Sequence, residues 1–109
     1  GRMKAERPEL LDRLAAYIDR HYNEHVTVSD LARQFYVSES SVSHLFKQKM
    51  GVSIYRYITQ RRLIAAKTLI RQRVPMEDVA HRVGFGDYST FYRAFKQEFG
   101  ISPRKFGQM

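Results

Sequence analysis

A degenerate internal repeat limits the fold of this chain more than any other feature. Residues 42–53 return as residues 91–102, 49 positions later in the sequence. The two copies share four identities and four apolar positions: Lys47/Lys96, Gln48/Gln97, Gly51/Gly100 and Ser53/Ser102, then Val42/Phe91, Phe46/Phe95, Met50/Phe99 and Val52/Ile101. A repeat of this length is one supersecondary unit used twice, so we expect two related subdomains. The apolar residues spaced four apart, including Met50, are predicted to face the core of each copy.

Apolar spacing and capping residues predict an all-α chain with seven helices and no strand. The expected ranges are about 8–23, 28–36, 39–50, 53–71, 75–83, 88–99 and 104–106. Thr27 and Asp30 have the pattern of a capping box at the start of the second helix. Other helix starts and ends are marked by capping side chains and by glycines suited to the left-handed conformation: Ser38, Ser53, Asp87 and Ser102, then Gly51, Gly84 and Gly100. Two pairs of helices therefore have the pattern of a helix-turn-helix.

A long helix is predicted to join the two subdomains. We expect a first helix-turn-helix subdomain at 8–52, a linker helix at 53–72 and a second helix-turn-helix subdomain at 73–107. At a rise of 1.5 Å per residue the linker is a rod of roughly 28 Å. Its apolar faces are Ile58, Ala66 and Leu69, flanked by Tyr55, Leu63 and Ile70; Arg62 within this stripe is predicted to form structural hydrogen bonds. Major grooves on one face of DNA recur about every 34 Å, so such a rod can set two helices one turn apart.

The net charge is strongly positive and unevenly distributed. Nineteen Lys and Arg against eleven Asp and Glu give +8, and residues 51–109 carry +7 of it. A surplus of this size suggests a polyanionic partner, although a merely soluble basic surface is the alternative. The absence of cysteine excludes disulfides, thiolate catalysis and cysteine-based zinc sites. The chain has no apolar run of membrane-spanning length, and no secretory signal precedes the domain. We expect a cytoplasmic protein, and we expect no cofactor.

Two exposed helix faces carry hydrogen-bond donors and no acid. They comprise Ser40, Ser43, His44 and Lys47 in the first copy, and Ser89, Tyr92, Arg93 and Lys96 in the second. Such faces can read base edges in a major groove and hold phosphate at one end, but a solvated helix face is the alternative for each residue. Thr90 and Ser41 could instead cap their own helices. Further phosphate candidates are Ser38, Lys49, Arg56, Arg104 and Lys105.

Two other classes of function were weighed against DNA binding. His21 and His25 have the i, i+4 spacing of metal ligands, but no third ligand or Glu base accompanies them. Neither a phosphate-binding glycine loop nor a nucleophile elbow is present, so we expect no catalysis and no metal site. A helical protein-interaction module is the second alternative, but it does not require donor-only faces on both copies. DNA binding that falls steeply with salt separates these possibilities.

Three motifs together resemble the AraC/XylS transcriptional regulators over about residues 8–107. They read Val37-Ser38-x-Ser40-x-Val42-Ser43-His44-Leu45-Phe46-Lys47-x-x-x-Gly51, Arg62-Leu63-x-x-Ala66-x-x-Leu69, and Ala80-x-x-Val83-Gly84-Phe85-x-Asp87-x-x-x-Phe91-x-Arg93-x-Phe95-Lys96-x-x-x-Gly100-x-Ser102-Pro103. One departure is Gly107 after Phe106, where the family has an arginine after the aromatic residue.

The resemblance implies sequence-specific binding to double-stranded DNA by a bacterial transcription regulator. Its recognition helices, about 39–50 and 88–99, would enter successive major grooves. The base-reading set it implies is Ser40, Ser43, His44, Ser89, Thr90, Tyr92 and Arg93. It also implies that RNA polymerase is a partner and that an effector-binding, dimerising domain precedes this one in the intact protein, this domain itself being monomeric.

Overall fold

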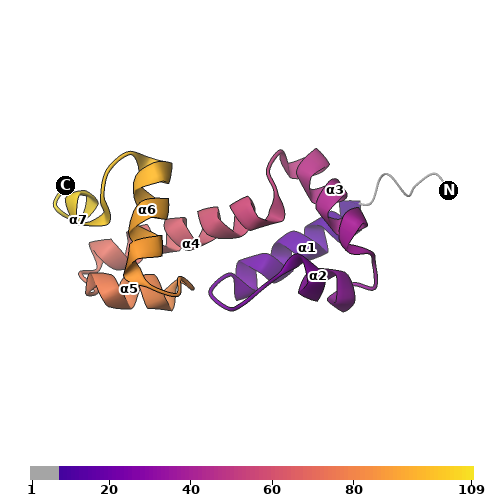
Figure 1. The fold of residues 1–109 in the computed structure, drawn as a ribbon, viewed down its shortest axis with the longest axis horizontal. Coiled ribbons are helices and arrows are strands. Elements are labelled where there is room, and N and C mark those ends of the chain that lie inside the picture. Colours follow the sequence, from indigo (N-terminus) through magenta and orange to yellow (C-terminus); the bar gives the residue numbers. More distant parts are fainter. Residues whose placement is uncertain (1–7) are drawn as a thin grey trace. The chain divides into compact units, whose positions relative to one another are not determined.

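The computed structural model describes residues 8–109 and confirms the all-α prediction (Figure 1). Over that range the chain forms seven helices and no strand: α1 (Pro8–His21), α2 (Val28–Gln34), α3 (Glu39–Met50), α4 (Ile54–Arg71), α5 (Met76–Arg82), α6 (Tyr88–Phe99) and α7 (Pro103–Gly107). The predicted bounds hold to within two residues at each end. The two recognition helices expected at 39–50 and 88–99 begin and end where the sequence placed them.

The described chain divides into two compact units. Residues 8–21 and 25–58 form the first unit, and residues 22–24 and 59–109 form the second. The division falls inside α4, which contributes its first turns to one unit and the remainder to the other. The separation into two subdomains and a distinct linker helix, with bounds at 52/53 and 72/73, stays a prediction.

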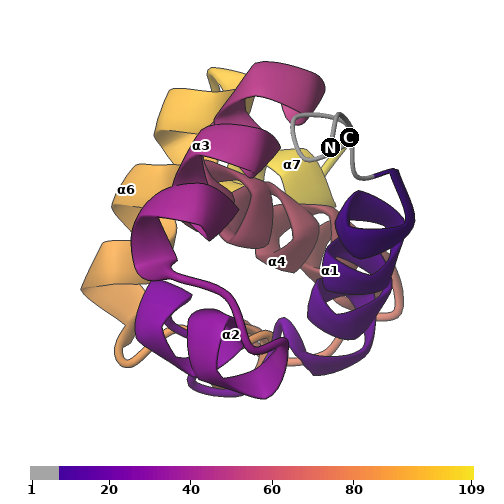
Figure 2. The same cartoon turned by 90° about the vertical axis from the view of Figure 1, so that its right-hand side faces the viewer.

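The core of the first unit is formed where α3 packs on α1 and α2 (Figure 2). Its buried residues are Leu10, Leu14, Ile18, Leu31, Ala32, Val42, Leu45, Phe46, Ile54 and Ile58. Two expectations for this core were wrong. Met50 is 37% exposed because it lies in the last turn of α3, whereas Leu45, which the spacing of four left out, is buried. Tyr55 was expected on an apolar face of the long helix but is 76% exposed.

The core of the second unit is largely aromatic. Phe91 and Phe95 of α6 are fully buried in one cluster with Leu63, Ala66 and Ile70 of α4, Val79 and Ala80 of α5, and Val83 just after α5. The Phe95 ring packs edge-on against Phe91 at 5.7 Å, Phe99 at 4.7 Å and Phe106 at 5.7 Å between centroids. Burial of a phenylalanine side chain contributes about 1.5–3 kcal/mol, so this cluster anchors α6 firmly on its unit.

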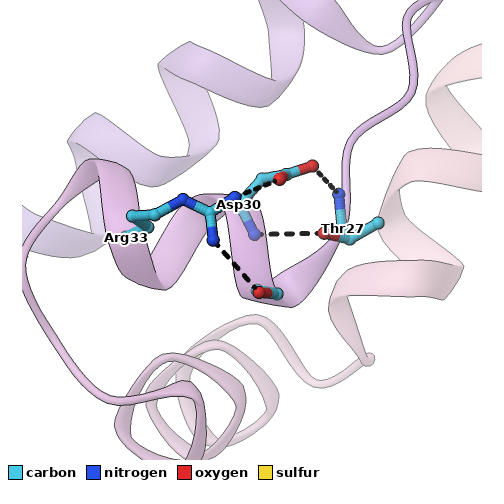
Figure 3. Close-up of polar contacts among 4 residues, drawn as sticks. Thr27, Asp30 and Arg33 are labelled. Atoms are coloured by element: carbon cyan, nitrogen blue, oxygen red, sulfur yellow. Dashed lines mark hydrogen bonds and ion pairs between the residues drawn. The ribbon is translucent and has the colours of Figure 1, made fainter.

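The capping box predicted at the start of α2 is present (Figure 3). The Thr27 hydroxyl accepts a hydrogen bond from the Asp30 backbone N–H at 3.0 Å, and the Asp30 carboxylate accepts one from the Thr27 N–H at 3.2 Å. Arg33 pairs with the other carboxylate oxygen at 2.8 Å. These hydrogen bonds to Thr27 hold the pKa of Asp30 below its ordinary value, with a smaller effect of the Arg33 charge. The box fixes where α2 begins.

Three helices end in the same way, with one residue at positive φ. These residues are Tyr36 after α2 (φ 57), Gly84 after α5 (φ 108) and Arg73 after α4 (φ 69). In each case the next N–H reaches five residues back: Val37 to Ala32 O, Phe85 to Ala80 O and Val74 to Leu69 O, at 3.0, 2.9 and 3.1 Å. This is the Schellman arrangement, whose left-handed residue is usually glycine. Only Gly84 was predicted, because Tyr36 and Arg73 do not carry the usual signal.

Arg62 forms the structural hydrogen bonds that the sequence predicted. Its Nε donates to the Tyr22 carbonyl at 2.6 Å and its Nη2 donates to the Glu24 carbonyl at 2.9 Å. The guanidinium also lies 5.8 Å from the centre of the Phe85 ring. Gly84 packs against the Arg62 guanidinium, since an added Cβ at residue 84 would be 2.8 Å from Arg62 Nε. Arg62 therefore holds residues 22–24 within the second unit.

Candidate nucleic-acid interface

Helices α3 and α6 are built alike at both ends. Each has 12 residues. The N-cap of α3 is Ser38, whose hydroxyl accepts from the Ser41 N–H at 3.0 Å, and the N-cap of α6 is Asp87, whose carboxylate accepts from the Thr90 N–H at 2.7 Å. Both helices end at a left-handed glycine, Gly51 at φ 82 and Gly100 at φ 81. The alternative in which Ser41 and Thr90 act as the caps is wrong, since they donate to the caps one turn earlier.

The outer face of α3 presents the predicted polar residues to solvent. Ser40, Ser43, His44 and Lys47 are all exposed. Their side chains are available because Val42, Leu45 and Phe46 occupy the buried side of the same helix. The face carries donors at i, i+3, i+4 and i+7, so one strip along the helix can approach a groove.

The outer face of α6 is similar but bears larger side chains. Ser89, Arg93 and Lys96 are exposed, and Tyr92 is half-buried with its ring 6.1 Å from that of Tyr88. Contact with Tyr88 restricts where the Tyr92 hydroxyl can reach. Arg93 has the long planar donor set that suits a guanine edge. The second face therefore has more reach than the first.

The electrostatics at the start of α6 keep its cap ionised. Hydrogen bonds from the Thr90 backbone and from the Thr90 hydroxyl lower the pKa of Asp87 below its ordinary value, with a smaller effect of the Arg93 charge. A carboxylate at a helix N-terminus is stabilised by the helix dipole as well. The Thr90 backbone N–H thus contacts the cap directly, and the role of the Thr90 side chain in base reading stays a prediction.

The predicted phosphate-contacting residues are all exposed. Apart from Ser38, they form two groups, one after each copy of the repeat. Lys47 and Lys49 end α3, and Arg56 lies in the first turn of α4; Lys96 ends α6, and Arg104 and Lys105 begin α7. Between them stand matching caps, because Ser53 accepts from the Arg56 N–H and Ser102 from the Lys105 N–H, both at 3.1 Å. Each of α3 and α6 is therefore followed by a capped turn and by a new helix with at least one basic residue in its first turn. Sequence reasoning chose these residues singly and missed that Arg56 and Lys105 are equivalent.

Ser38 differs from the other phosphate candidates. Its hydroxyl oxygen accepts the Ser41 N–H, and its O–H lies 2.8 Å from the Ser41 hydroxyl. Both the donor and the acceptor function of the Ser38 hydroxyl are thus used in capping α3.

The pair His21 and His25 is the alternative metal site weighed above. The His21 ring stacks on Tyr17 with 4.3 Å between ring centroids. Residues 8–109 contain no group of three or more His, Asp or Glu side chains that could hold a metal ion.

Comparison with known proteins decides the family. The model of a family described as a helix-turn-helix domain matches residues 31–109. The chain belongs to the AraC-type helix-turn-helix family. The transcriptional activator RhaS of Citrobacter koseri is 35% identical over 99 residues, and the match covers 90% of this chain and 36% of RhaS. The probable transcriptional regulator LumQ of Photobacterium leiognathi is 34% identical over 91 residues, covering 83% of this chain and 37% of its own.

Solved structures share this fold. The C-terminal domain of AraT, a response regulator from Geobacillus stearothermophilus, has a TM-score of 0.88 at 29% identity, covering 91% of this chain and 84% of that one. The DNA-binding domain of AdpA, solved with a target DNA, shares the fold with a TM-score of 0.85 at 23% identity, covering 90% and 89%.

The AraC-type chain described here is a DNA-binding domain of the kind found in transcriptional regulators. It spans a little over a third of the length of the curated relatives it matches. The family is one of DNA-binding regulators and not of enzymes. No helix of residues 8–109 is long and apolar enough to cross a membrane.

Proposed function

We propose that this AraC-type domain reads double-stranded DNA with α3 and α6, placed in successive major grooves. The observation that supports this most is the shared construction of the two helices. Each has a buried apolar side, an outer strip of donors, the same left-handed glycine end and a following helix with a basic first turn. Two matched surfaces of this kind are expected when one ligand presents the same feature twice, as the grooves of a duplex do.

The base-reading roles differ between the helices. On α6, Arg93 forks onto a guanine edge, while Ser89, Thr90 and Tyr92 contact neighbouring bases. On α3, the readers are Ser40, Ser43 and His44, whose shorter side chains allow fewer bidentate contacts. The first half-site is therefore read less strictly than the second.

The phosphate-contacting residues fix the register on the duplex. Lys47, Lys49 and Arg56 hold the backbone beside α3, and Lys96, Arg104 and Lys105 hold it beside α6. Ser38 contributes at the start of α3 by turning its O–H from the Ser41 hydroxyl to a phosphate oxygen. Because the turns after α3 and α6 are equivalent, Arg56 and Lys105 are expected to contact phosphates in equivalent positions of the two half-sites. Such contacts carry affinity but no sequence information.

Beyond DNA, the proposal extends to the intact protein. In it the domain acts in the bacterial cytoplasm beside a further domain that binds an effector and dimerises, and RNA polymerase is a second partner at the promoter. The length of the relatives supports this, since this chain spans only 36% of RhaS. The isolated domain is expected to bind DNA as a monomer.

A randomised-site selection with wild-type and Arg93→Ala protein tests the reading role. We expect Arg93→Ala to weaken the selected site by about 1–3 kcal/mol and to relax preference at one base pair. Lys96→Ala is the matched control on the same helix, because it should weaken all sequences alike and reduce the salt slope by about one. An Arg93→Ala protein that selects the wild-type sequence with unchanged preference would show that Arg93 is not a reader.

Footprinting of the selected site tests the placement of the two helices. Protection over two successive helical turns on one face of the duplex is expected for residues 8–109. Protection confined to one turn would show that only one helix enters a groove. Binding that hardly changes with salt would favour a protein-interaction module instead.

A further inference from the structure

The second unit has a pocket that no residue of the outer face of α6 lines, although Arg104, one of the proposed phosphate contacts, does. It is bordered by the end of α4, the turn before α5 and the helix α7, and its volume is about 330 Å³. The lining residues that matter here are Ile70, Arg73, Val74, Met76, Arg104 and Gly107. This volume is at the lower end of the range for small-molecule sites.

The floor of the pocket is apolar. It is left uncovered because residue 107 is a glycine and has no side chain to fill the space. Ile70 is buried, and Val74 and Met76 are half-buried. A Cβ at Gly107 would lie 3.0 Å from Ile70 Cγ2 and 3.6 Å from Met76 Cε, so even a methyl group would press on the floor. The same glycine is the position where the family resemblance predicts an arginine. A long side chain there would occupy or cover this space.

The rim of the pocket is positively charged. Arg73 and Arg104 line it from two different elements, both are exposed, and no acidic residue lines the pocket. Across residues 8–109 neither guanidinium has a salt bridge or side-chain hydrogen bond. Arg73 also has φ 69, a left-handed conformation that is strained for a non-glycine residue. The chain thus places a second arginine at the pocket at a position where glycine would be less strained.

We propose that this pocket binds a small carboxylate with an apolar body of about one ring. The two guanidiniums pair with the carboxylate, since arginine forms strong charge-assisted hydrogen bonds to planar anions. The apolar body lies on Ile70, Val74 and Met76 and excludes water from them. A simple phosphate fits less well, because it would leave the apolar floor hydrated. The proposal does not depend on DNA binding.

The test uses benzoate as the probe, titrated into the DNA-free domain and followed by NMR of the Ile70 and Met76 methyl groups. Benzyl alcohol supplies the ring without the charge, and inorganic phosphate supplies charge without the ring. We expect benzoate to bind with a Kd on the order of 1 mM and benzyl alcohol at least about tenfold more weakly. Phosphate should not move the methyl signals.

Three variants separate the contributions. Arg73→Asn removes one charge while keeping a residue that tolerates positive φ, and Arg104→Gln removes the other. Each should weaken benzoate about tenfold or more. Gly107→Ala should weaken benzoate with both charges intact, whereas Gly86→Ala, where an added Cβ meets nothing within 4 Å, should leave it unchanged. Amide spectra of each variant show whether the unit is folded.

Several results would overturn the proposal. Benzoate that leaves the Ile70 and Met76 signals of the folded wild type unmoved would do so, as would equal binding of phosphate or benzyl alcohol. An acidic peptide that binds the same residues more tightly than benzoate would point to a protein partner instead. Because all arms are measured without DNA, their failure leaves the DNA-reading function untouched.

Discussion

Replacement of Gly84 by alanine tests how the turn after α5 is held. Gly84 has φ 108, and an added Cβ would meet Arg62 Nε at 2.8 Å and Asn23 Cα at 3.0 Å. The substitution therefore imposes two costs, one from the backbone conformation and one from the contact with Arg62 and Asn23. Gly51 and Gly100 supply the matched comparison, since they have φ 82 and 81 but nothing within 4 Å of an added Cβ.

The size of the effect follows from these contacts. Positive φ costs an alanine about 1–2 kcal/mol, partly offset by the lower entropy of its unfolded chain, so Gly51→Ala and Gly100→Ala should each cost about 1 kcal/mol. At Gly84 the Arg62 side chain must also move, which weakens its hydrogen bonds to Tyr22 and Glu24. Charge-assisted hydrogen bonds contribute about 1.5–3 kcal/mol when well buried and less at this partly exposed site, so Gly84→Ala should cost about 2–4 kcal/mol in total.

The free energy of unfolding is measured by urea denaturation, with amide hydrogen exchange in α4 to α6 reporting on the second unit. The double variant Gly84→Ala/Arg62→Met should cost about 1 kcal/mol less than the sum of the single variants, because removal of the guanidinium frees the space. Gly86→Ala, with open space and no positive φ, should be nearly neutral. If Gly84→Ala cost no more than Gly51→Ala, the contact with Arg62 would not constrain this turn.

Three further predictions concern the core, the turns and the caps. Phe95→Ala should destabilise by about 3–5 kcal/mol, measured by urea denaturation, since Phe95 is fully buried and contacts three aromatic rings; a loss below about 1 kcal/mol would contradict this. Tyr36→Gly should raise stability by about 0.5–1 kcal/mol in the same assay, because Tyr36 has φ 57 and a side chain that is 94% exposed; a loss would show that its ring has a packing role. Because the pKa of Asp87 is lowered, its ionised form stabilises the fold fully above the ordinary value of 3.8, and this contribution is lost as the pH falls through the folded-state pKa. Asp87→Asn, which still caps, should flatten that acid dependence in thermal melts while the wild type loses Tm below pH 3.8.

The sequence predicted the helices well because their ends carry strong local signals. Ser38 and Asp87 are capping side chains, and Gly51 and Gly100 supply the left-handed residue, so α3 and α6 could be bounded without knowledge of the fold. The outer donors were equally predictable, since the buried side of each helix leaves only one exposed strip. Of the residues expected to contact DNA, all but the half-buried Tyr92 are exposed for this reason.

Features that depend on distant residues were harder to predict. Met50 continues the spacing of four but lies in the last turn of α3 and is 37% exposed. Arg62 was expected to form structural hydrogen bonds, but its acceptors lie 38 and 40 residues earlier in the sequence, and no local signal identifies them. Tyr36 and Arg73 adopt positive φ because the Schellman hydrogen bonds at the ends of their helices require it. The pocket beside Gly107 likewise forms from three separate segments.

The two hydrophobic cores consist of separate stretches of the sequence, so the order of synthesis on the ribosome affects their folding. Every buried residue of the first core lies between Leu10 and Ile58, so that core is complete in sequence before residues 59–109 are made. Residues 22–24 precede that point in the sequence but belong to the second unit. Arg62, which binds two of their carbonyl groups, is translated 38 residues after Glu24. We therefore expect the nascent first half to fold early with one loop left unanchored, and that loop to gain protection from proteolysis only after Arg62 has emerged.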